Sequence, residues 1–176
     1  GFIDIDEFLE IKTSETFESI VKSLEANEHV GALSVNWKVH TSADLLERPQ
    51  SVRQNFTECM DEKLDIERGD KGIERHVKSF VKTQYFTGLI SPHMFQLKDN
   101  AISVGEDERT FQPGVAWRQP PTWDRIVLHH YAVKSKQEFQ EKLDRWKGEV
   151  PRNWEYWDMV HSGTPYHCPE MTKFSP

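Results

Sequence analysis

The stretch that decides the fold is "RIVLHHYAVKSKQEFQEKLDRW", residues 125–146. Its first part, residues 125–131, is rich in β-branched and aromatic side chains, which is typical of a buried strand. The second part repeats apolar residues at the spacing of one helical face, after a serine that suits a helix N-cap. We therefore predict a helix from Ser135 to Trp146, with an apolar face formed by Phe139, Leu143 and Trp146.

A strand followed by a helix also opens the chain. Residues 2–6 are an apolar run that ends in acids and predict a short strand, and residues 14–24 carry apolar side chains at helical spacing. Further strands are expected at residues 31–39, 77–81, 88–95 and 101–104, and loops at residues 40–75 and 105–123, the first with a short helix around residues 52–59. Together these units predict an α/β domain with a mixed sheet and flanking helices.

The composition excludes several classes of protein. The chain has 176 residues, enough for one domain with a buried core. Its net charge of −7 leaves no large basic surface, so we expect no nucleic-acid partner. Its apolar runs are short and interrupted by charges, whereas a membrane helix needs about 20 apolar residues. We therefore expect no membrane span within this chain.

The cysteines and one glycosylation motif bear on the cellular compartment. Cys59 and Cys168 lie far apart without a CxxC pattern, and two thiols are too few for a zinc cage or a disulfide scaffold. They leave the redox compartment open. Asn55-Phe56-Thr57 matches the acceptor pattern for N-linked glycosylation, which matters only in a secretory compartment.

An acidic pair stands near the start of the chain, in "GFIDIDEFLEI", residues 1–11. In an extended strand Asp4 and Asp6 would point to one side while Ile5 packs on the other. Two carboxylates at a strand end suit Mn²⁺ or Mg²⁺, which keeps open positions for the phosphates of a substrate. The alternative is that these acids solvate the edge of a sheet.

A second group of polar residues follows the strand at residues 125–131. In "LHHYAVKS", residues 128–135, a histidine could give a neutral imidazole to a metal, and Lys134 could meet a phosphate. Side chains alternate along a strand, so only one of His129 and His130 faces such a site, and we favour His130. The alternative is a hydrogen-bonded core histidine and a lysine that begins a solvated helix.

Four short motifs occur in a fixed order: "FIDIDEFLEI", "GALSVNWKV", "RHVKSFVKT" and "IVLHHYAVKSKQEFQEKLDRW". In this order they resemble glycosyltransferase family 92 and its family 2-like relatives, over the chain up to about residue 148. The resemblance implies a GT-A type transferase with a nucleotide-sugar donor, a glycan or other hydroxyl acceptor, and a divalent cation, Mn²⁺ or Mg²⁺. It assigns residues 1–148 to a partial catalytic region, without the N-terminal nucleotide-binding strands, and residues 149–176 to an aromatic-rich tail.

The resemblance also implies site residues. Asp4 and Asp6 match the metal-binding DxD motif, and His130 matches the histidine of an N-H-Y motif that has asparagine where this chain has His129. Lys134 and Ser135 match the K-S pair of the family and are expected to bind substrate.

Two further predictions concern the acceptor. An inverting transferase needs a carboxylate that takes the proton of the acceptor hydroxyl, and Asp107 and Glu106 in "GEDER" are the candidates. A solvated acidic turn is the alternative for that loop. Trp37 either offers its ring to an acceptor sugar or packs in the core.

Two rival interpretations remain open. The first is a Mg²⁺-dependent phosphohydrolase of the haloacid dehalogenase type, in which the first aspartate of a DxD motif is the nucleophile; here Glu7 and Phe8 follow the motif and no matching distal acidic pair is evident. The second is a truncated, non-catalytic carbohydrate-binding remnant. The compartment expected by resemblance is the Golgi lumen for a eukaryotic chain and the cytoplasm for a bacterial one.

Overall fold

The computed structural model describes residues 1–110, 115–145 and 153–174. The chain divides into two compact units, each described by itself: unit 1 contains residues 1–38 and 69–129, and unit 2 contains residues 39–68 and 130–176. The boundary expected between residues 148 and 149 lies outside the described residues. Within the described part of the chain, no helix is both long enough and apolar enough to cross a membrane.

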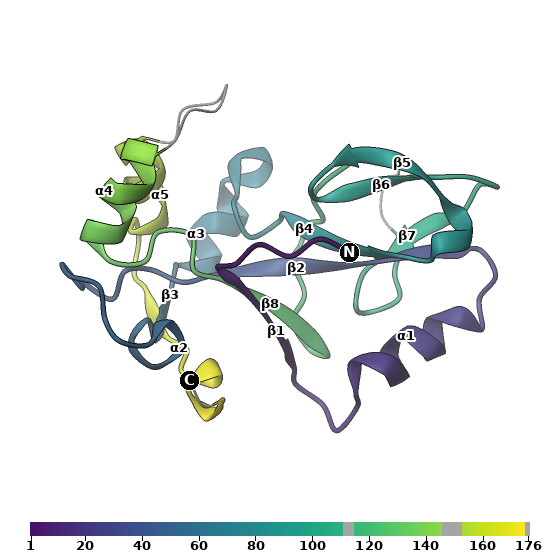
Figure 1. Ribbon diagram of the computed structural model, residues 1–176, viewed down its shortest axis with the longest axis horizontal. Helices are drawn as coiled ribbons and strands as arrows, with labels where there is room; N and C mark the ends of the chain where they lie inside the picture. Colours follow the sequence, from purple (N-terminus) through teal and green to yellow (C-terminus); the bar gives the residue numbers. More distant parts are fainter. Residues whose placement is uncertain (111–114, 146–152, 175–176) are drawn as a thin grey trace. The chain divides into compact units, whose positions relative to one another are not determined.

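Unit 1 is built on a five-stranded sheet in which β1, β8, β2 and β4 lie in that order and β7 also pairs with β2 (Figure 1). The strands are β1 (Glu7–Ile11), β2 (Val30–Val39), β4 (Val77–Val81), β7 (Ile102–Val104) and β8 (Ile126–His130). β4 runs antiparallel to β2 and β7 runs parallel to it. The predicted mixed sheet is therefore confirmed, as are the strands expected at residues 31–39, 77–81, 101–104 and 125–131.

The remaining elements of unit 1 flank this sheet. They are α1 (Phe17–Glu25), the antiparallel hairpin β5 (Phe86–Ser91) and β6 (Met94–Leu97), and the 3₁₀ turns η1 (Gly69–Lys71) and η2 (Thr83–Tyr85). The single strand expected at residues 88–95 is wrong, because Pro92 and His93 form the turn of the hairpin.

Helix α1 begins later than predicted, because Thr16 is its N-cap. The Thr16 hydroxyl accepts a hydrogen bond from the Ser19 N–H, and the Ser19 hydroxyl accepts one from the Thr16 N–H, at 3.1 and 2.9 Å. Such reciprocal bonds satisfy donors that a helix start leaves unpaired. Ile20 and Leu24 are buried, as the helical spacing predicts.

Strand β2 is the centre of the sheet, and all ten of its residues are buried. Two of its polar side chains, Ser34 and Asn36, bond to neighbouring segments. The Ser34 hydroxyl lies 2.8 Å from the Ser79 hydroxyl of β4, which in turn donates to the carbonyl of His93 at 2.8 Å. The Asn36 amide donates to three carbonyls, those of Glu74, Arg75 and Arg118. These buried polar groups are therefore satisfied.

The strand predicted at residues 2–6 is wrong. The Glu7 N–H donates to the Asp4 carbonyl at 3.0 Å, and the Asp4 N–H donates to the Glu7 carboxylate at 2.8 Å. These two bonds close a turn, and β1 begins only at Glu7. Ile5 was expected to pack inward but is 95% exposed at the tip of the turn. Asp4 and Asp6 therefore do not share one face of a strand.

Unit 2 contains four short helices, one two-stranded sheet and a C-terminal turn among its described residues. The elements are α2 (Val52–Asn55), β3 (Glu58–Cys59), α3 (Glu62–Glu67), α4 (Lys136–Arg145), α5 (Trp154–Val160), β9 (Tyr166–His167) and the 3₁₀ turn η3 (Glu170–Lys173). β3 and β9 are antiparallel. The segment expected as a long loop therefore holds β3 and α3 in addition to the predicted short helix.

Helix α4 confirms the prediction from the deciding stretch. The Glu138 N–H donates to the Ser135 hydroxyl at 3.3 Å, and that hydroxyl donates to the Glu138 carboxylate at 2.8 Å, so Ser135 caps the helix. Phe139 is fully buried against the rings of Trp154 and Trp157, each 5.2 Å away. The predicted helix end at Trp146 lies outside the described residues.

Candidate functional site

The candidate site in unit 1 is an acid–lysine cluster, formed by Asp4, Glu7 and Lys78. The Lys78 ammonium lies 2.9 Å from the Asp4 carboxylate and 3.7 Å from the Glu7 carboxylate. The side chains of Lys78 and Glu7 are 1% and 0% exposed, whereas that of Asp4 is 63% exposed. The cluster therefore joins a buried ion pair to a carboxylate that ligands in solution can reach.

Glu7 is the inner member of this cluster and is held from two sides. One carboxylate oxygen accepts the indole N–H of Trp37 at 2.9 Å, and the other accepts the Asp4 N–H at 2.8 Å. Burial raises the pKa of the Glu7 carboxyl above its usual 4.5, although the bond from Asp4 and the charge of Lys78 oppose this rise. Glu7 thus links the turn at residues 4–7 to β2 and β4.

Trp37 belongs to a ring cluster with His76 and His93. Its ring stacks on His76 at 5.2 Å and meets His93 edge-on, also at 5.2 Å. Trp37 is only 8% exposed, and its indole N–H is used by Glu7. This arrangement favours core packing, one of the two roles predicted for Trp37, and a stacking role toward an acceptor sugar stays a prediction.

His93 is held as a neutral imidazole beside Trp37. Its Nδ1 lies 3.0 Å from the Val77 carbonyl, to which it donates. Burial lowers the pKa of His93 below its usual 6.5, with the nearby charge of Lys78 acting in the same direction.

We expect the resonances of the His93 ring to titrate below pH 6.5 in NMR spectra of the folded protein. Because its pKa is lowered on folding, the unfolded chain binds more protons between the two pKa values. The contribution of His93 to the free energy of unfolding is thus complete above about pH 6.5 and is lost as pH falls through the folded pKa. His93→Gln should remove this part of the pH dependence in urea unfolding, and a ring that titrates at or above pH 6.5 would contradict the assignment.

Asp6 lies on the other side of Ile5 from Asp4 and is half-buried. Asp4 and Asp6 do not share one face of a strand, since both lie in the turn at residues 4–7 that leads into β1. Their oxygens are the ligand type that Mn²⁺ and Mg²⁺ prefer, and such ions take most of their coordination from water and phosphate. The oxygens of Asp4 and Asp6 are of the type that a hard divalent cation prefers, but the Lys78 ammonium already lies 2.9 Å from the Asp4 carboxylate. Cation binding by the two aspartates stays a prediction.

Glu106, one of the two predicted general bases, is 1% exposed and anchors the start of β8. Its carboxylate accepts the main-chain N–H groups of Asp124, Arg125 and Ile126, at 3.2, 2.6 and 3.2 Å. A base must reach the acceptor hydroxyl, and these bonds occupy the carboxylate instead.

Asp107, the other predicted base, is half-buried and pairs with the guanidinium of Arg118. It also accepts the N–H of Arg109 at 3.2 Å. Asp107 is therefore the more accessible of the two candidates, and its role as a base stays a prediction.

His129 and His130 face opposite sides of β8. The His129 imidazole lies 3.0 Å from the Glu10 carboxylate of β1, and both side chains are buried. By alternation along the strand, His130 then lies on the other face of β8. His130 is 3% exposed, and its carbonyl accepts the N–H of His40 in unit 2 at 3.0 Å. Its role as a metal ligand stays a prediction.

Lys134 and Ser135 lie between β8 and α4 in unit 2. Lys134 has a φ of 55°, in the left-handed region that residues with a side chain seldom adopt. Such backbone outliers concentrate at functional positions. Ser135 is buried and caps α4, which explains its residue type without a ligand. Substrate binding by either residue stays a prediction.

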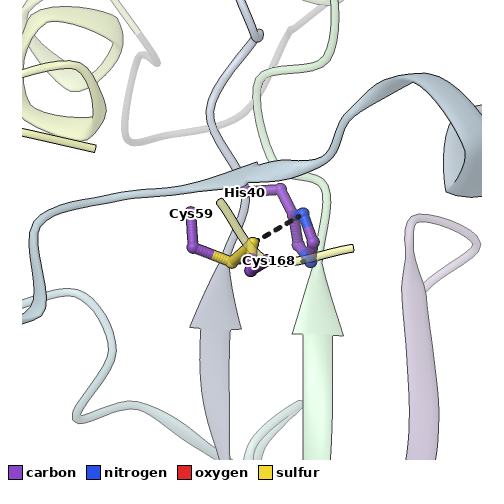
Figure 2. A group of neighbouring side chains, drawn as sticks. All are labelled: His40, Cys59 and Cys168. Carbon is purple, nitrogen blue, oxygen red and sulfur yellow. Dashed lines mark hydrogen bonds between the residues drawn. A yellow bond between two sulfur atoms is a disulfide. The ribbon is translucent and has the colours of Figure 1, made fainter. Parts of the chain in front are cut away.

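His40, Cys59 and Cys168 gather in unit 2 (Figure 2). The two cysteines form a disulfide, and the His40 ring lies 3.9 Å from the sulfur of Cys59 and 3.7 Å from that of Cys168. Disulfide sulfurs are not thiolates, so this group does not bind a metal as it stands. The sequence left open whether these two cysteines pair, and the structure shows that they do. Within the described ranges, no group of three histidine, cysteine or acidic side chains with clustered ligand atoms includes Asp4 or Asp6.

Unit 1 also contains a pocket of about 670 Å³ beside α1, β2 and β4. Apolar side chains make up most of its lining, which includes Phe17, Val21, Leu24 and Phe80. Its lining does not include Asp4, Asp6, Glu7 or Lys78. The pocket is therefore separate from the acid–lysine cluster.

Sequence reasoning missed the part that Lys78, Glu7 and His76 play in the site. The only signal was a lysine inside the apolar strand at residues 77–81, where a charged residue needs a partner when it is buried.

In comparisons with known proteins, no protein-family model matches this chain and no curated protein matches its sequence.

Proposed function

We propose that this chain is a metal-dependent glycosyltransferase of the GT-A type, which moves a sugar from a nucleotide-diphosphate donor to a hydroxyl group of a glycan or another acceptor. The observation that carries the proposal concerns Asp4, the first residue of the D-x-D motif. Its carboxylate is exposed and contacts the buried ammonium of Lys78. The order of the four sequence motifs supports it as well.

Asp4 and Asp6 would hold the cation, Mn²⁺ or Mg²⁺. When bound, such a cation offsets the negative charge that develops on the leaving nucleotide diphosphate. Lys78 orients the Asp4 carboxylate through its contact at 2.9 Å and places a positive charge beside it. A positive charge next to a carboxylate pair suits a ligand that carries phosphate groups.

Further roles in the proposal rest on the resemblance. Asp107 accepts the proton of the acceptor hydroxyl, and the transfer inverts the anomeric configuration. In unit 2, His130 is a metal ligand, and Lys134 and Ser135 contact substrate. A single substitution of Asp107, His130, Lys134 or Ser135, followed by the donor-binding measurement below or by an assay of sugar transfer, tests each role.

The test is calorimetric binding of a panel of nucleotide sugars to the full chain with Mn²⁺ present. We expect one donor to bind only when the cation is present. Asp6→Asn should weaken that binding by at least about tenfold, since even the replacement of a residue that only supports a metal ligand lowers metal affinity by about this factor. Asp99→Asn is the matched control, because Asp99 is an exposed aspartate of the same unit.

Equal donor binding by the wild type and Asp6→Asn would refute the metal role of this residue. Absence of donor binding across the panel would refute the transferase proposal for this chain and favour the carbohydrate-binding remnant. Hydrolysis of an aryl phosphate that disappears in Asp4→Asn would favour the phosphohydrolase instead.

A further inference from the structure

The glycosylation motif Asn55-Phe56-Thr57 lies at the end of α2 in unit 2, with its asparagine outward and its middle residue inward. Asn55 is exposed, and its side chain makes no hydrogen bond or ion pair with another described residue. Phe56 is 0% exposed, and its carbonyl accepts a bond from the His40 ring at 2.8 Å. The buried Phe56 fixes the position of the segment, and the Asn55 amide is accessible in the folded unit.

The same segment continues directly into a buried disulfide. The Thr57 carbonyl accepts the N–H of Cys168 at 2.8 Å, and Cys59 follows two residues later. Cys59 and Cys168 are 0% and 1% exposed and are joined across 109 residues. Disulfides form and persist in oxidising compartments, and N-linked glycosylation occurs in the secretory pathway. The disulfide and the motif are separate features that indicate one compartment.

The side of α2 next to Asn55 is already engaged. The Gln54 amide donates to the Thr172 carbonyl at 2.8 Å and so fixes α2 to η3. Since Asn55 makes no such contact, a large group on its amide displaces nothing that the structure shows. A bulky, hydrophilic modification at this position is compatible with the fold.

We propose that Asn55 is an N-glycosylation site and that this chain matures in the lumen of the secretory pathway. In the transfer, the Asn55 amide nitrogen forms a bond to the anomeric carbon of an oligosaccharide, whose bond to a lipid diphosphate carrier breaks. The amide loses one proton and the lipid diphosphate leaves. Cys59 and Cys168 lose two protons and two electrons to a protein disulfide as they pair. Neither step depends on the proposed transferase activity.

The test expresses the full chain behind a cleavable secretion leader in cultured animal cells. Leader-cleaved protein is treated with peptide-N-glycosidase, which converts a glycosylated asparagine to aspartate, and peptides are mapped by mass spectrometry without reduction. We expect Asn55 to be converted and Cys59 to be linked to Cys168. The wild-type band should shift on a gel after the enzyme is added.

Two substitutions at one position provide the matched control. Thr57→Ala destroys the acceptor pattern and should abolish the shift, whereas Thr57→Ser preserves the pattern and should retain it. Both change the same half-buried side chain, so a folding defect alone would not separate them. Leader-cleaved, disulfide-linked protein with unmodified Asn55 would overturn the proposal, as would a shift that persists in Thr57→Ala.

Discussion

Replacement of both Cys59 and Cys168 by alanine should lower the free energy of unfolding by about 3 to 5 kcal/mol. The disulfide joins residues that are 109 positions apart, so its removal frees a long loop in the unfolded chain. It also joins the two-residue strand β3 to the residue that directly follows the two-residue strand β9.

Urea unfolding followed by tryptophan fluorescence measures this effect. Trp154 and Trp157 report on unit 2, since both pack on the buried Phe139. Dithiothreitol should bring the wild type to the stability of the double variant and leave the variant unchanged. A double variant as stable as the oxidised wild type would show that the disulfide does not constrain the fold.

Lys78→Met should cost about 3 to 5 kcal/mol of stability at neutral pH, because it leaves the Glu7 carboxylate buried without its cation. The double variant Glu7→Gln/Lys78→Met should recover most of this loss, since it leaves no charge of this buried pair behind. Urea unfolding of the wild type, the two single variants and the double variant gives the coupling energy. Additive effects of the two substitutions would contradict a direct interaction.

The same pair predicts a pH dependence. Burial raises the pKa of Glu7 above 4.5, so the folded protein binds more protons than the unfolded chain between the two pKa values. Its contribution to stability is therefore complete below about pH 4.5 and is lost as pH rises through the folded pKa. Lys78→Met should extend this loss to higher pH and so enlarge it, because the positive charge that opposes the rise of the Glu7 pKa is gone. Glu7→Gln should abolish it.

Local rules were sufficient where an element is stabilised by its own residues. The strand that ends at His130 and the helix after Ser135 could be predicted from side-chain type, apolar spacing and a cap, all of which lie within a few positions of each other. The mixed sheet followed from the order of strands and helices. The start of the chain did not, because the bond from the Asp4 N–H to the Glu7 side chain converts an apparent strand into a turn.

The site depended on contacts that spacing does not reveal. The strand at residues 77–81 was predicted, but Lys78 becomes a buried cation only through acids that lie more than 70 positions earlier. The disulfide was missed for the same reason, since two distant cysteines in a sequence do not show whether they meet. The difference in exposure between Glu106 and Asp107 could not be predicted either, because the burial of Glu106 goes with its bonds to the main chain at the start of β8.

The polar residues inside β2 have a consequence for the accuracy of folding. A strand buried on both faces lacks the alternation of apolar and polar residues that usually prevents slippage by one position. Ser34 lies opposite Ser79, so a pairing with β4 that is shifted by one residue would break the 2.8 Å bond between the two hydroxyls and take this partner from the buried Ser34 side chain. Ser34 and Ser79 thus favour the native register of β2 against β4. Replacing both by alanine should produce a mixture of registers rather than an unfolded chain.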